Sequence, residues 1–422
     1  MTSFLSLVVA SSGFFYVSLL MAFIGFFLSI ISLRGKLPRG QGHFALLYMF
    51  FFIPGFMFMF EHEFGDVVRD LLLLLKNILY LYLGVILYRL DIKGNAQRFL
   101  FLILIYSFLE MSIYLIKFLV YVSAHSYSIG GVRDNVGHGS ILPVYGCFSL
   151  MLLRSKLKAT FLNSRKLFLV FLTIFVIYLL ATASRTLIIS VVIFILIVRD
   201  WLWIDRFKSV IAALVVSLVL ISLYNSGDHS LNKDMTNRTL MDKMSDSLAE
   251  MLPSDFDDDS LIHKNWRAYE SFRGLLSFFS ASDMQKVFGQ GYGTLIDVDF
   301  EKRLSGSDKT GTTITDIPWM HNAYIYVLVK NGIVGFSFLI IMFLYIYLKI
   351  LKYNRLYVIS GSERSFCYIA LFSVLHLFFS TFIDGGLINR WDSSVNFFIL
   401  GISLAFLSNG ELNERVNNPS VH

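Results

Sequence analysis

Charged residues are scarce in this sequence: they make up 16% of its 422 residues, against about 25% in soluble proteins. The two cysteines, Cys147 and Cys367, both lie in apolar runs and provide neither a disulfide framework nor a metal-binding pattern. The Gly289–Gly293 turn lacks the Gly-Lys-Ser/Thr of a phosphate loop, and the Asp255–Asp259 cluster lacks the alternation and final glutamate of an EF-hand. We therefore expect neither a cofactor nor a bound metal.

Apolar residues are abundant: 56% of the chain is hydrophobic and the mean hydropathy is +0.65. No soluble fold of this length could bury so much apolar surface. The sequence thus predicts an all-α polytopic membrane protein with about 11–12 transmembrane helices and one large, mainly helical external loop. The distribution of Lys and Arg matters more than the net charge of +6, because these residues orient the spans, and we expect no nucleic-acid partner.

Eleven apolar runs are candidate spans, since a bilayer takes about 20 residues: 4–33, 44–60, 71–90, 99–122, 140–153, 167–183, 186–198, 209–224, 333–351, 366–383 and 395–408. The first run lacks a basic leader and a clear cleavage site, so we interpret it as a retained span. Alternate loops are basic, which predicts an external N-terminus and a cytoplasmic C-terminus.

One external loop, Asn225–Met320, is much longer than the others. It holds 16 Asp and Glu against 10 Lys and Arg, a net charge of −6, so the rest of the chain carries +12. We predict an amphipathic helix near Asn265–Phe279 and a tight turn at Gly289–Gly293 within it; Asp255–Asp259 is interpreted as a solvated acidic patch. The predicted organisation is an N-terminal transmembrane bundle, the loop, C-terminal transmembrane helices and a disordered cytoplasmic tail, at 1–224, 225–320, 321–410 and 411–422.

His321 stands where this loop meets the next apolar run. Histidine is the side chain that exchanges a proton near neutral pH without special tuning, so it is a candidate general base. The alternative is an interfacial ring that merely faces water and headgroups.

Three external arginines form a candidate anion site, because the planar guanidinium binds phosphate through two parallel hydrogen bonds. Arg185 occupies a tight turn between two apolar runs, Arg267 lies on the predicted loop helix, and Arg133 lies in another external loop. Their respective alternatives are snorkelling to lipid phosphates, a surface salt bridge and a solvated turn.

Glu110, Lys117 and Lys76 are ionisable residues inside apolar runs, where such groups usually face the bundle interior or a wet cavity. Glu110 and Lys117 are seven residues apart and therefore share a helix face. We treat Lys117 and Lys76 as candidate substrate-binding residues; a structural ion pair is the alternative.

His321 and Asn322 are followed by nine residues, Gly332, two residues and Gly335. This pattern, closing a large external loop, resembles the signature of the O-antigen ligase and polymerase superfamily of bacterial envelope enzymes. The Ser-Arg turn at Ala183–Thr186 and the arginine–helix–Gly-x-Gly-x-Gly order of 265–293 are similar to the family's pattern. The family usually has twelve spans and an internal N-terminus, and the predicted topology departs from it there.

The resemblance implies a C-type fold and an inverting, metal-independent glycosyltransferase. The donor would be a glycan on undecaprenyl diphosphate, used at the periplasmic face of the bacterial inner membrane among membrane lipids. His321 would deprotonate the acceptor, Arg185 and Arg267 would neutralise the leaving diphosphate, and Arg133 and Asn322 would assist binding. Gly332 and Gly335, three apart on a helix, would let another helix approach closely.

The acceptor separates two enzymes of this superfamily. A ligase uses lipid A-core, whereas a polymerase uses the next lipid-linked repeat unit, and either enzyme could work with a chain-length regulator. We favour a ligase, because the His-Asn-x9-Gly-x-x-Gly pattern is best known from ligases. A flippase for lipid-linked glycans would explain the spans and arginines, but not a long external loop ending in a histidine motif.

Overall fold

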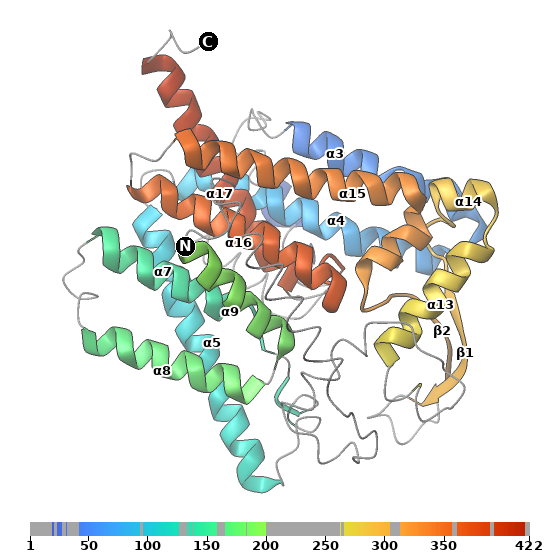
Figure 1. Cartoon of the computed structure of the whole chain (residues 1–422), viewed down its shortest axis with the longest axis horizontal. Helices are drawn as coiled ribbons and strands as arrows, with labels where there is room; N and C mark the ends of the chain where they lie inside the picture. Colours follow the sequence, from blue (N-terminus) through green and yellow to red (C-terminus); the bar gives the residue numbers. More distant parts are fainter. Residues whose placement is uncertain are drawn as a thin grey trace, which may run out of the picture.

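A computed structural model gives the structure of the chain (Figure 1). It describes residues 42–92, 96–125, 139–157, 165–182, 184–199, 266–303, 313–356, 361–388 and 392–417, with a few isolated residues before them and between them. These residues form helices and one two-stranded sheet, which confirms the prediction of an all-α membrane protein. Almost all of run 4–33, run 209–224 and the Asp255–Asp259 cluster lie outside the described residues.

Four helices in the described part of the chain are long and apolar enough to cross a membrane: α4 (Phe64–Leu87), α5 (Ala96–Ala124), α15 (Ala323–Leu356) and α16 (Gly361–Ile383). Shorter apolar helices accompany them: α3 (Gly42–Phe52), α7 (Leu142–Leu157), α8 (Arg165–Thr182), α9 (Arg185–Val198) and α17 (Asp392–Asn417). The pairs α4–α17, α16–α17 and α15–α16 pack together and form much of the buried core.

Two predicted boundaries are wrong. The run at 44–60 is not one helix: α3 ends at Phe52, and two short 3-10 turns, Pro54–Phe56 and Met59–Glu61, follow it. Pro54 explains the break, since proline lacks the N–H that would continue an α-helix. At the other end, α17 continues to Asn417, so residues 411–417 are helical and the prediction of a disordered tail fails for them.

The described part of the long loop holds α13 (Trp266–Ser280), α14 (Asp283–Phe288), β1 (Ile296–Arg303) and β2 (Thr313–Ile317). Helix α13 confirms the predicted amphipathic helix. The antiparallel β1–β2 pair, with Ile296 opposite Ile317, was not predicted. All four elements gather at one end of the molecule, beside the start of α15 (Figure 1).

Helix α15 starts ten residues before the predicted run and is kinked at Gly332, where φ is +66° and ψ is −171°. A side chain at Gly332 would collide with the carbonyl of Val287, at the end of α14. A side chain at Gly289 would likewise collide with the carbonyl of Lys330. The kink and the Gly-rich turn therefore fit against each other, and both require glycine.

Hydrogen bonds fix this turn to α15 and to the 3-10 turn Pro54–Phe56. Gln290 N donates to Val329 O at 2.8 Å, and Tyr292 N donates to Gly55 O at 2.9 Å. Burial raises the pKa of the Tyr292 phenol well above its ordinary value, so the group stays a neutral donor.

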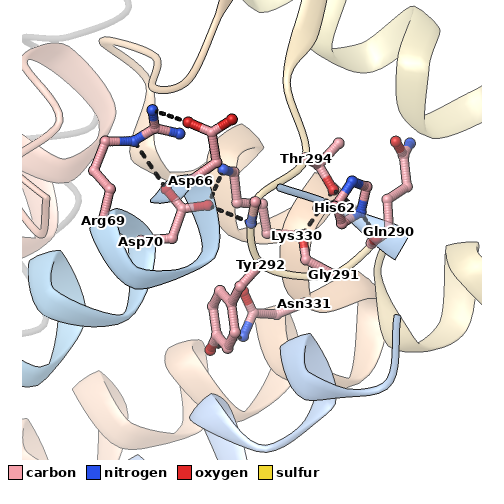
Figure 2. Close-up of polar contacts among 11 residues, drawn as sticks. His62, Asp66, Arg69, Asp70, Gln290, Gly291, Tyr292, Thr294, Lys330 and Asn331 are labelled. Carbon is pink, nitrogen blue, oxygen red and sulfur yellow. Dashed lines mark hydrogen bonds and ion pairs between the residues drawn. The ribbon is translucent and has the colours of Figure 1, made fainter. Parts of the chain in front are cut away.

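A buried ion pair ties the same region to α4 (Figure 2). Asp70 pairs with Lys330, and both side chains are fully buried. The same carboxylate accepts a hydrogen bond from Gly293 N at 2.8 Å, and Arg69 lies on its other side, with Nε 3.6 Å from Oδ1. Helix α4, the Gly-rich turn and the start of α15 are thus held as one unit.

Candidate active site

His321 is held just outside the first turn of α15. Asn322 caps the helix: its Oδ1 accepts hydrogen bonds from Tyr324 N at 3.1 Å and Ile325 N at 3.4 Å. An asparagine at this position satisfies helix N–H groups that would otherwise lack partners. The cap fixes where α15 begins and so fixes the backbone that carries His321.

The imidazole of His321 contacts a carboxylate from the loop helix α13. His321 Nδ1 lies 2.6 Å from Glu270 Oε2, and the backbone N of His321 donates to the same oxygen at 3.3 Å. The Glu270 side chain is 4% exposed, whereas that of His321 is 38% exposed. One edge of the ring is therefore held by a buried carboxylate while the ring stays open to solvent.

Close packing places α13 against this region. A side chain at Gly274 would collide with the Met320 side chain and crowd that of Ile325, so α13 approaches the start of α15 closely. Tyr269 adds a second fixed point, because its hydroxyl donates to the carbonyl of Val298 in β1. Helix α13 is thus located by contacts that are separate from the Glu270–His321 pair.

Arg267 lies on α13 one turn before Glu270 and reaches the end of α16. Its guanidinium is 3.4 Å from Asp384 Oδ1 and donates to Ile383 O at 3.4 Å. The Arg267 side chain is 25% exposed. Gly385, the residue after Asp384, lies against the carbonyl of His321, since a Cβ at Gly385 would be 3.4 Å from that oxygen. The structure thus brings the predicted residues Arg267 and His321 to one site.

Arg185 is the first residue of α9, and its side chain lies outside the described residues. The backbone places it at the same end of the bundle as Arg267. Ser190 Oγ of α9 and His376 Nδ1 of α16 are 2.8 Å apart, which sets the two helices side by side. Arg185 comes five residues before Ser190 and Ile383 comes seven residues after His376, distances of roughly 8 and 10 Å at 1.5 Å per residue.

The remaining predicted residues have different surroundings. Arg133 lies outside the described residues. Lys76 is buried in α4, as expected of a charge in an apolar run. Lys117 is exposed on α5, so it does not face the bundle interior, which was one of its two expected surroundings; that it faces a wet cavity stays a prediction. Glu110, on the same helix, is only half buried, with its Oε2 atom covered.

The two motif glycines have different roles. Gly335 lies against the carbonyl of Phe51 in α3, which agrees with the predicted close helix approach. Gly332 does not lie on a regular helix, because its φ is positive and its neighbour is the end of α14. The expectation that both glycines lie on a helix and let another helix approach therefore fails for Gly332, although both positions exclude a side chain.

Sequence reasoning missed Glu270 and Asp384. Glu270 follows Arg267 by three residues on a predicted amphipathic helix, which was the one available signal, since i and i+3 lie on the same face. Nothing near Asp384 indicated that α16 would end beside the loop helix.

Within the described residues, no three His, Cys, Asp or Glu side chains are grouped closely enough to hold a metal ion. The chemistry this site can perform is proton transfer by an imidazole beside an anion-binding arginine.

Residues 168–340 match the family model described as O-antigen ligase. The matched region contains α13, the Gly-rich turn, Arg185, Arg267 and His321. The match confirms the resemblance to the O-antigen ligase and polymerase superfamily, whose members are glycosyltransferase-like enzymes. A search of curated proteins finds no match to the chain.

Proposed function

We propose that this chain, a multi-pass membrane protein of the O-antigen ligase and polymerase type, is an O-antigen ligase. It would transfer a glycan from undecaprenyl diphosphate to lipid A-core at the periplasmic face of the inner membrane. One observation carries the proposal: inside the matched region, a partly exposed imidazole is held by a buried carboxylate one helical turn from Arg267.

In the proposed reaction, an acceptor hydroxyl attacks the anomeric carbon of the donor sugar. The new C–O bond forms as the sugar–diphosphate bond breaks, with inversion at that carbon, and undecaprenyl diphosphate leaves with the bonding electrons. His321 takes the hydroxyl proton as the bond forms. The sugar–diphosphate bond supplies the driving force, so the proposed reaction needs no nucleotide-activated sugar. We propose that it is also independent of metal, as the family resemblance implies.

Arg267 is proposed to neutralise the charge that develops on the departing diphosphate. Preorganised charge of this kind is usually the largest single contribution to catalysis. In the structure the Arg267 guanidinium pairs with Asp384, and the diphosphate of the donor would replace that carboxylate. Arg185 is proposed to bind the same diphosphate from the start of α9, with Arg133 as a third candidate.

The lipopolysaccharide of a deletion strain tests the assignment. Core without O-antigen, together with polymerised glycan accumulating on undecaprenyl diphosphate, is the expected result for a ligase. Core capped with a single repeat unit would instead show a polymerase with the same donor chemistry. Normal O-antigen display would contradict both.

A further inference from the structure

One oxygen of Glu270 makes two contacts to a single residue. Glu270 Oε2 lies 2.6 Å from the ring Nδ1 of His321 and accepts a hydrogen bond from its backbone N at 3.3 Å. The carboxylate is buried, and a buried carboxylate needs such partners because desolvation of its charge is costly. The two contacts fix both the ring and the backbone that carries it.

We propose that Glu270 is the positioning residue of His321: it holds the ring proton on Nδ1 and so leaves Nε2 as the atom that receives the proton of the acceptor. This inference rests on the proposed function and names the reacting atom within it. Glu270 acts through the imidazole and does not itself touch the substrate.

The physical reason is the difference between the two ring nitrogens. In a neutral imidazole one nitrogen carries the proton and the other is the acceptor, and the hydrogen bond at one decides the state of the other. An ionised carboxylate only accepts, so it selects the tautomer with the proton on Nδ1. When Nε2 takes up a second proton, the same carboxylate stabilises the imidazolium through a charge-assisted hydrogen bond.

The charged groups around His321 are few within the described residues. Arg267 and Glu270 face this region from α13, and Asp384 faces it from the end of α16. Arg267 and Asp384 are 3.4 Å apart and partly offset each other's charge. Glu270 is the carboxylate that touches the ring.

A purely structural role for Glu270 predicts something different. Glu270 would then be a tether between α13 and α15, yet the Gly274 and Tyr269 contacts already locate α13. The substitution Glu270→Gln keeps the length and an accepting oxygen, but it removes the charge and adds an amide NH2 that can donate to Nδ1, so the side chain no longer selects one tautomer. A tether would survive this change, whereas a positioning carboxylate would not.

Steady-state kinetics of the full-length protein in proteoliposomes separates the two roles. The probes are lipid-linked glycan, extracted from a strain that lacks ligase activity, and lipid A-core. We expect Glu270→Gln to lower kcat by about 10²- to 10⁴-fold, the contribution of general base catalysis, with an unchanged donor KM. Asp297→Asn, which removes an exposed carboxylate paired with Arg273 at 3.6 Å, is the control and should leave kcat unchanged. An unchanged kcat in Glu270→Gln would overturn the proposal.

The tautomer itself can be measured without altering Glu270. Nitrogen-15 NMR of the detergent-solubilised protein, labelled at histidine, distinguishes protonated from bare ring nitrogens at about pH 8.5, above the ordinary range of histidine. The signal that disappears in His321→Ala identifies the residue. A protonated Nδ1 with a bare Nε2 is expected, and the reverse assignment would overturn the proposal.

Transfer abolished by His321→Ala but unaffected by Glu270→Gln would reject this inference alone, whereas transfer that survives His321→Ala would reject the proposed function.

Discussion

Arg267 and Glu270 lie three residues apart on α13 and contact two different parts of one site. Arg267 binds Asp384 at the end of α16, and Glu270 binds His321 before the start of α15. Residues at i and i+3 share a helix face, so one turn of α13 supplies both the cation and the carboxylate. A shift of α13 would therefore disturb the anion site and the base together.

Replacement of Arg267 by lysine tests the anion site. Lysine keeps the charge but cannot form the two parallel hydrogen bonds of a guanidinium, so we expect Arg267→Lys to lower kcat/KM by about tenfold or more. Arg273→Lys is the matched control on the same helix, because Arg273 pairs with the exposed Asp297, and it should retain activity. We expect Arg185→Lys to behave like Arg267→Lys. Equal activity of the two α13 variants in transfer assays would reject a diphosphate-binding role for Arg267.

Asp384 is expected to compete with the donor for Arg267. The pair is partly exposed, and such pairs contribute about 0.2–1 kcal/mol. Asp384→Asn should therefore lower the donor KM by up to about fivefold and leave kcat unchanged. Asp283→Asn, in an exposed pair with Lys286 on α14, is the control. A rise in donor KM would show instead that Asp384 orients the arginine for binding.

The kink in α15 should tolerate no side chain at Gly332. Gly332→Ala places a Cβ against the Val287 carbonyl at a positive φ, and we expect a loss of about 1–3 kcal/mol or more in the free energy of unfolding. In Gly65→Ala, by contrast, the added Cβ on α4 meets nothing within 4 Å, and the change should be neutral or stabilising. Thermal unfolding in detergent compares the two variants. Equal melting temperatures would contradict the packing described here.

The buried Asp70–Lys330 pair predicts strong coupling. Removal of the Asp70 carboxylate leaves the charge of Lys330 buried without its partner, at a cost of about 3–5 kcal/mol, whereas removal of Lys330 leaves Asp70 beside Arg69 and should cost less. The double variant Asp70→Asn, Lys330→Met should recover most of that loss, because no unpaired charge remains and the asparagine oxygen can still accept from Gly293 N. Additive losses in the unfolding free energy would show that the pair does not act as a unit.

The helices of the membrane region could be predicted because their apolar runs are local properties of the sequence. The start of α15 could not be predicted in this way. Lys330 and Asn331 interrupt the apolar run, yet both are buried, because Asp70 pairs with the lysine and the Phe51 carbonyl accepts from the asparagine. Their partners lie about 260 residues or more away in the sequence, so composition alone placed the boundary too late.

The site was predictable in its parts but not in its connections. His321 and Arg267 stood out by residue type and position, and the strand β1 left a signal that was missed, since Ile296 and Val298 alternate with Asp297 and are buried. Glu270, in contrast, resembled any acidic residue of an amphipathic helix until the fold set it against His321. Its role depends on a contact across 51 residues of sequence.

We propose that His321 is the base of a lipid-linked glycan transfer. The most direct test of this proposal is transfer by purified His321→Ala, reconstituted with the lipid-linked donor and the acceptor, after confirming that the variant inserts and unfolds at the same temperature as the unmodified protein. We predict that transfer is lost, and that a strain carrying only this variant displays core without O-antigen. Transfer at the unmodified rate by the folded variant would contradict the account.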